Sequence, residues 1–233
     1  MKKLLKIGLT RIEKIILWLL IYLPRLKKNT DEVILLRTDN IGDYILFRNL
    51  LPFIRDAEQY RNRRLIMIGN IAWSNLAEHF DHQFIDKFIW IDTPRYQQSR
   101  RYRLTIFLKM FSIRAAELIN TVHSRSYLTN DLTLLCRAKK RISSFGDSIN
   151  LPNEASKQAS DALFDVLLPS LSNIDFEFYR NKTFIEHLIG QSIELLKPNF
   201  NEIKKEIKSL QILIFPSAHS TLRRWDTDRK SVV

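Results

Sequence analysis

Two short polar segments of this 233-residue chain carry side chains that could do chemistry. The first, residues 37–43, reads Arg-Thr-Asp-Asn-Ile-Gly-Asp and places two carboxylates four residues apart around a glycine that allows a tight turn. Asp43 then lies at or near the start of a helix, where backbone N–H groups favour its ionised form. It could simply cap that helix, or it could be a general base that takes a proton from a hydroxyl nucleophile. The spacing alone leaves both interpretations open.

The second segment, residues 217–225, combines hydroxyl and imidazole groups with a pair of arginines. These side chains are those of Ser217, His219, Ser220, Thr221, Arg223 and Arg224. Guanidinium groups match phosphate oxygens in a fork geometry, and a helix N-terminus beside them would complete an anion site. The alternative is a solvated polar turn with two exposed arginines, because charged residues are mostly exposed.

The elements that must position these segments follow a regular alternation. Short, nearly continuous apolar runs are typical of strands buried on both faces, and here they alternate with helical patterns. The expected strands are 32–37, 64–69, 86–91, 116–122, 140–144 and 210–215; the expected helices are 43–55, 72–80, 105–114, 126–138, 155–168 and 176–196. This order predicts an α/β, doubly wound parallel sheet with right-handed crossovers. Both polar segments follow a strand, at the edge of the sheet where such folds bind ligands.

The net charge of +12 is concentrated near the N-terminus. Residues 1–28 hold eight Lys and Arg against one Glu, beside an apolar run, 15–23, that is shorter than the roughly 20 residues of a membrane-spanning helix. The pattern predicts a basic amphipathic helix on an anionic membrane surface. The alternatives are a helix packed on the protein's own core, a true span or a signal peptide. Because the rest of the chain carries little excess charge, a nucleic-acid-binding module is the weaker hypothesis and no nucleic-acid partner is expected.

Other classes of site are excluded by the composition. One cysteine, Cys136, rules out a disulfide framework, and the five glycines are too far apart for a dinucleotide-binding turn or a phosphate-binding loop of the P-loop kind. His79 and His82 with Asp81 lack further ligands nearby, so no metal site is expected.

Several stretches together resemble the heptosyltransferases of glycosyltransferase family 9. They are ILLRTDNIGDYILFRNLLP (34–52), IMIGN with Trp73, FIWID (88–92), INTVHSR (119–125), FEFYRNKTF (176–184) and ILIFPSAHSTLRRW (212–225). The resemblance implies a GT-B architecture, in which two Rossmann-like domains face each other across a cleft. It also implies inverting, metal-independent transfer of a heptose or related sugar from a nucleotide-diphosphate sugar, such as ADP-heptose, to a lipopolysaccharide core acceptor, with no cofactor.

The resemblance also assigns roles to individual residues. Asp43 matches the family's catalytic base, and Arg224 matches the basic residue that faces the donor diphosphate. Ser217, Ser220 and Thr221 fall in the phosphate-contacting loop, although Ser217 stands where the family usually has glycine. We expect Arg125, which follows a strand, and Asn40 to contact the acceptor, and Asp39 to serve loop structure.

These inferences predict three parts of the chain: a membrane-associated helix (1–28), a Rossmann-like acceptor domain (29–195) and the start of a nucleotide-sugar-binding domain (196–233). Because family members continue well beyond Trp225, we expect a C-terminally truncated chain. The expected location is cytoplasmic, peripheral to the inner membrane, where a lipid-linked acceptor is found. The alternative function is an inactive fragment that only binds the acceptor at the membrane.

Overall fold

The computed structural model describes residues 31–111, 113, 115–171, 176–195 and 197, together with Ile15, Ile16 and Leu19. These residues belong to the first of the two units into which the chain divides, Met1–Pro198. The second unit, Asn199–Val233, lies outside the described residues, and so does the strand expected at 210–215. The predicted three-part division of the chain therefore stays a prediction.

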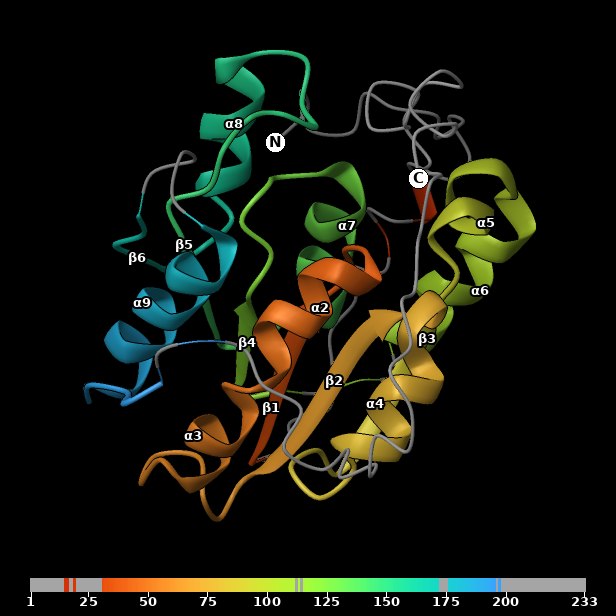
Figure 1. Cartoon of the computed structure of the whole chain (residues 1–233). Coiled ribbons are helices and arrows are strands. Elements are labelled where there is room, and N and C mark those ends of the chain that lie inside the picture. Colours follow the sequence, from red (N-terminus) through yellow and green to blue (C-terminus); the bar gives the residue numbers. More distant parts are fainter. Residues whose placement is uncertain are drawn as a thin grey trace, which may run out of the picture. The chain divides into compact units, whose positions relative to one another are not determined.

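One parallel sheet of six strands organises the described residues (Figure 1). Its strands are β1 (Glu32–Arg37), β2 (Arg64–Asn70), β3 (Lys87–Ile91), β4 (Glu117–Asn120), β5 (Lys140–Ser144) and β6 (Val166–Leu168). They lie in the order β3-β2-β1-β4-β5-β6, which is the Rossmann order. In the register of the central strands, Leu36 of β1 pairs with Ile68 of β2 and Asn120 of β4. The predicted α/β class is therefore confirmed.

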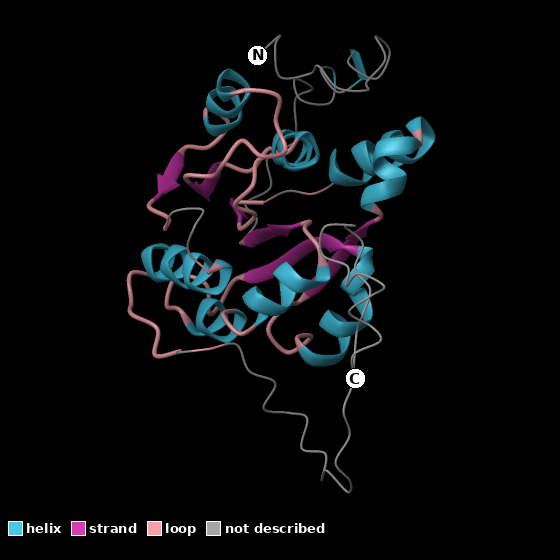
Figure 2. Cartoon of the chain, turned by 45° about the horizontal axis from the view of Figure 1, so that its top comes forward, coloured by secondary structure: helices cyan, strands magenta, loops and turns pink. Residues whose placement is uncertain are grey.

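Helices cover both faces of the sheet (Figure 2). Along β1, Val33 and Leu35 face one hydrophobic cluster while Ile34 and Leu36 face the other, because successive strand side chains alternate between faces. The first cluster packs against α2 (Ile41–Arg48), α3 (Leu51–Asp56), α4 (Ser74–Phe80) and α9 (Glu177–Ile189). The second packs against α5 (Thr93–Gln98), α6 (Arg100–Phe111) and α7 (Tyr127–Cys136), with α8 (Glu154–Asp161) beside α7. The sheet is thus doubly wound, as the sequence predicts.

The helix expected at 43–55 is two helices, α2 and α3, separated at Asn49 and Leu50. Pro52 is the cause, because proline has no backbone N–H to donate and its ring clashes with the preceding helical turn. It therefore lies in the first turn of α3. The glycine expected to make a tight turn, Gly42, lies inside the first turn of α2 and has no positive φ.

The C-terminal ends predicted for two longer helices are wrong. Residues 155–168 contain α8 only up to Asp161; the backbone N–H of Asp165 then donates to Arg141 O at 2.8 Å and brings the chain to the sheet edge as β6. The helix expected at 176–196 ends at Ile189, because Gly190 adopts φ +70° and its N–H closes the last turn.

An aromatic stack joins α2 to the sheet through the short 3-10 turn η1 (Ile71–Trp73). The rings of Tyr44 and Trp73 lie parallel with centroids 3.9 Å apart, and Trp73 meets Trp90 edge-on at 5.1 Å. Gly69 makes this packing possible, since a Cβ there would come within 2.2 Å of Trp73 and 2.8 Å of Trp90. The stack fixes α2, and with it the segment 38–43, over the end of β2.

Candidate functional site

A pocket of about 690 Å³ opens at the carboxyl ends of β1 to β4. Its lining comes from the segments that follow those four strands, with Asn150 after β5 and Glu177 at the start of α9. Strands β1 and β4 are neighbours in the sheet, and the chain leaves them toward opposite edges. Loops diverge at such a switch point, and open parallel sheets bind their ligands there. The pocket therefore lies where the fold is expected to hold a ligand.

Asn40 and Asp43, two of the predicted site residues, both line this pocket. Asn40 is the N-cap of α2, and the Asp43 carboxylate, three residues later, accepts a hydrogen bond from the Asn40 backbone N–H at 3.1 Å. Asp43 is half-buried, and within the described part of the chain its other carboxylate oxygen takes no hydrogen bond. The side chain thus caps the helix and keeps one oxygen available to a ligand in the pocket.

The fully buried Arg37 at the end of β1 holds the floor of the pocket together. Its guanidinium donates to Asp39 at 3.1 Å, to the backbone oxygen of Asp43 at 2.9 Å and to Glu177 at 3.0 Å. It also reaches the Thr121 carbonyl after β4 and Asn181 on α9. Arg37 therefore joins β1, β4, α2 and α9, and it fixes the turn that presents Asp43.

Asp39 lines the pocket as well, although the sequence assigned it to loop structure. Its carbonyl accepts from the indole N–H of Trp73 at 3.1 Å, which is a structural role, but its carboxylate is 15% exposed. Burial raises the pKa of Asp39 to about 7, against the lowering effect of Arg37. Burial also raises the pKa of Glu177, but Arg37 and Arg180 outweigh it and hold that pKa below its usual range.

Asp131 is a further carboxylate in the pocket, and it was not predicted from the sequence. It lies on α7, is 8% exposed, and accepts a hydrogen bond from the Tyr96 hydroxyl at 2.8 Å. Burial raises its pKa to about 7, against the lowering effects of the Tyr96 hydrogen bond and the Arg103 charge. Apart from Asn130, its neighbours on α7 are apolar or hydroxyl residues, so nothing in the local pattern marks Asp131 as a pocket residue.

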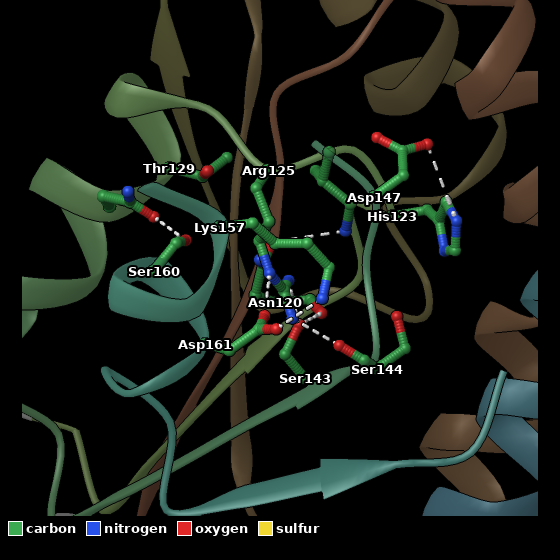
Figure 3. Close-up of polar contacts among 12 residues, drawn as sticks. Asn120, His123, Arg125, Thr129, Ser143, Ser144, Asp147, Lys157, Ser160 and Asp161 are labelled. Carbon is green, nitrogen blue, oxygen red and sulfur yellow. Dashed lines mark hydrogen bonds and ion pairs between the residues drawn. The ribbon is translucent and has the colours of Figure 1, made fainter. Parts of the chain in front are cut away.

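His123 lines the pocket after β4 and lies beside Asp147, which follows β5 (Figure 3). The His123 Nε2 lies 3.7 Å from the Asp147 carboxylate, which also accepts a hydrogen bond from the Ser124 hydroxyl. Gly146 allows this close packing, since a Cβ there would lie 2.2 Å from the His123 carbonyl oxygen. The imidazole is therefore held against a carboxylate from the neighbouring loop.

Arg125, which the sequence predicts to contact the acceptor, lies inside the protein. Arg125 does not line the pocket and has no exposed surface. Its guanidinium donates to Asp161 at 2.8 Å and to the Ser143 hydroxyl at 2.8 Å, and it also bonds the Ser144 carbonyl (Figure 3). These partners come from α8 and β5, so Arg125 is an internal brace between the strands and α8.

The remaining predicted site residues, Ser217, Ser220, Thr221 and Arg224, lie outside the described residues. Of the segment 1–28, only Ile15, Ile16 and Leu19 are described: Ile16 packs against the second hydrophobic cluster, while Ile15 and Leu19 are exposed. In the described part of the chain no helix is both long and apolar enough to cross a bilayer. The same residues contain no group of side chains arranged to hold a metal ion.

Comparison with known proteins identifies the fold. No protein-family model matches the chain, and no curated protein matches it in sequence. A family 9 glycosyltransferase structure from Veillonella parvula does match, with a TM-score of 0.53 and 13% identity over 70% of this chain and 43% of that one. The E. coli heptosyltransferase WaaC with ADP matches with a TM-score of 0.53 and 11% identity, over 71% and 50%. The described chain has the fold of part of a family 9 glycosyltransferase.

The resemblance drawn from the sequence is thus confirmed at the level of the fold. The chain spans half or less of the length of these two structures. The pocket that Asn40 and Asp43 line lies at the carboxyl edge of the Rossmann-like sheet.

Proposed function

We propose that this chain is an inverting, metal-independent glycosyltransferase of the heptosyltransferase kind, and that its described residues bind the acceptor. The proposed reaction transfers a heptose or related sugar from a nucleotide-diphosphate sugar to a lipopolysaccharide core acceptor. The observation that carries the proposal is the half-buried Asp43 carboxylate, which lines the pocket at the switch point of a family 9 fold. One of its oxygens caps α2 and the other is available to an acceptor hydroxyl.

In the proposed reaction Asp43 acts as the general base. It takes the proton of an acceptor hydroxyl as that oxygen forms a bond to the anomeric carbon of the donor sugar. The bond from the anomeric carbon to the diphosphate breaks at the same time, and the nucleoside diphosphate leaves with the electron pair. Attack from the side opposite the leaving group inverts the anomeric centre. General-base catalysis of this kind contributes about 10²–10⁴ in rate.

Donor binding and location are the less direct parts of the proposal. The WaaC structure contains ADP, which supports an adenosine diphosphate sugar as the donor. Ser217, Ser220, Thr221 and Arg224 remain the predicted contacts to its diphosphate. The basic segment 1–28 would hold the chain at the anionic cytoplasmic face of the inner membrane, beside a lipid-linked acceptor.

The test measures ADP release by the 233-residue chain from ADP-heptose, with delipidated lipopolysaccharide core oligosaccharides as acceptors. We expect Asp43→Asn to lower kcat by at least about 100-fold with little change in the KM of the acceptor, because the base acts only in the transition state. Full turnover by Asp43→Asn would refute its role. A chain that binds the oligosaccharides but releases no ADP would refute the catalytic part and leave acceptor binding alone.

Asp92→Asn is the matched control. The Asp92 carboxylate also lies at a helix start, where it accepts the Arg95 backbone N–H at 2.9 Å, but it does not line the pocket. The same substitution therefore removes a carboxylate charge at a helix start in both variants, and only Asp43→Asn removes the proposed base. Equal losses in the two variants would point to stability rather than catalysis.

A further inference from the structure

The charged side chains that line the pocket determine which acceptors can bind in it. Four carboxylates line it, from three different parts of the chain: Asp39 and Asp43 after β1, Asp131 on α7, and Glu177 at the start of α9. Among the described lining residues the side chains able to carry positive charge are Arg103 and His123. The lining therefore has more acidic than basic groups.

Both of these basic groups are committed to partners inside the protein. Arg103 is 6% exposed, and its guanidinium donates to the carbonyls of Tyr96 and Gln97 at 2.9 Å. His123 is 9% exposed and lies against Asp147. Neither presents an open cationic surface of the kind that a carboxylate or phosphate group on a ligand needs.

Two buried arginines at this edge of the sheet are also directed inward, and Arg180, which is 13% exposed, pairs with the lining residue Glu177 at 2.7 Å. Arg37 and Arg125 are fully buried, and every nitrogen of each guanidinium donates to a protein oxygen. Arg37 lies behind Asp39 and Glu177, so the pocket meets the carboxylates rather than the guanidinium. Arg37 and Arg125 therefore bind groups of the protein itself and present no charge to the pocket.

The uncharged part of the lining suits a polyhydroxylated ligand. It includes the amide and hydroxyl side chains of Asn70, Gln97, Thr93, Ser126, Tyr127 and Asn150. Amides and hydroxyls both donate and accept hydrogen bonds, while carboxylates accept from hydroxyl or ammonium groups. We propose, as an extension of the proposed function, that the acceptor bound here is a neutral sugar or an amino sugar, and not a sugar acid or a phosphorylated sugar.

The physical reason is that a buried anion needs a donor or a cation to replace its water. A carboxylate or phosphate placed among these four acidic groups would be desolvated beside like charges, and such juxtapositions are strongly unfavourable. A hydroxyl or ammonium group in the same position gains hydrogen bonds from the same oxygens. The lining therefore selects against anions as well as for hydroxyl groups.

The test compares three methyl glycosides that share one ring: methyl β-D-glucopyranoside, the methyl β-D-glucuronide, and the methyl glycoside of glucosamine. Binding to the full 233-residue chain is measured by NMR titration at pH 8, where Asp39 and Asp131, with pKa values of about 7, are mostly ionised. We expect the glucuronide to bind at least about tenfold more weakly than the glucopyranoside, and the amino sugar to bind at least as well as the glucopyranoside.

Two variants make the comparison specific to the pocket. Asp39→Asn removes one lining carboxylate and should reduce the difference in binding affinity between the glucopyranoside and the glucuronide. Asp56→Asn removes an exposed carboxylate on α3 that does not line the pocket, and it should leave the difference unchanged.

Equal or tighter binding of the glucuronide would overturn the proposed preference while leaving the glycosyltransferase proposal intact. Absence of binding by all three glycosides would contradict the acceptor pocket itself, and so both proposals. An Asp56→Asn variant that shifts the preference as much as Asp39→Asn would assign the effect to overall charge and refute the role of the pocket.

Discussion

Asp131 should make the stability of this protein depend on pH in a way that one substitution abolishes. Its pKa is about 7 in the folded chain, because the carboxylate is buried, and 3.8 is the ordinary value for an exposed aspartate. Between these two values the folded state holds more protons than the unfolded state, so the free energy of unfolding falls as pH rises. Above about pH 8 both states are ionised and the contribution is constant.

The size of the effect follows from the same two values. Each pH unit in this window changes the free energy of unfolding by about 1.36 kcal/mol for one group. From pH 5 to pH 7 the parent chain therefore loses about 2 kcal/mol through Asp131, because the carboxyl group is already half-ionised at pH 7. Asp131→Asn has no titrating group there, and its amide oxygen can still accept the Tyr96 hydroxyl. The free energy of unfolding of the variant minus that of the parent should therefore be larger at pH 7 than at pH 5 by this amount.

The assay is urea unfolding of both chains at pH 5, 6, 7 and 8, followed by tryptophan fluorescence and extrapolated to zero urea. Taking the difference between variant and parent at each pH cancels the contribution of Asp39, which titrates in both. Asp56→Asn, at an exposed position on α3, is the control and should show a difference that does not change with pH. If the difference in free energy of unfolding between Asp131→Asn and the parent is also independent of pH, the argument that burial sets this pKa is refuted.

Three other substitutions test the packing that supports the pocket, each by urea unfolding. Asp81→Asn should lower the free energy of unfolding by about 3–5 kcal/mol, because Asp81 is buried and pairs with Arg48 at 2.8 Å, and the buried guanidinium would lose this counter-ion. A decrease below about 1 kcal/mol would contradict this. Gly69→Ala should cost about 1–3 kcal/mol or more through its clash with Trp73, and an unchanged midpoint would refute the close approach. Gly42→Ala meets nothing within 4 Å and should stabilise α2 by about 0.5–1 kcal/mol, so a marked loss of stability would contradict its helical conformation.

The sheet could be predicted from the sequence because its signal is local. Strands β1 and β5 have the bounds expected from their apolar runs, and burial on both faces is what makes such runs continuous. Strand β6 could not be predicted in the same way. Its residues continue a helical pattern, and they become a strand only because β5 offers an unpaired edge. Helix α5 was missed although Asp92 before Thr-Pro is a recognisable helix start.

The candidate site likewise contains residues whose positions follow from the local sequence and residues whose positions depend on distant contacts. The positions of Asn40 and Asp43 follow from the order strand, loop, helix, which the local sequence predicts. The burial of Arg125 depends on Asp161, which is 36 residues away, and the pocket positions of Asp131 and Glu177 depend on how α7 and α9 pack on the sheet. No spacing in the sequence reports these contacts, so the charge of the pocket becomes visible only in three dimensions.

The network around Arg37 also sets the order in which the pocket can form. Arg37 and α2 are synthesised early, but two of the acceptors of Arg37, Glu177 and Asn181, come 140 and 144 residues later. Contacts this distant in sequence form late, because the intervening chain must first be ordered. Until α9 docks, a buried guanidinium lacks its partners and the turn that presents Asp43 is only partly held. The pocket is therefore completed only when α9 docks, and a chain shortened before α9 would lack Glu177 as well as the apolar face of α9 that covers the sheet.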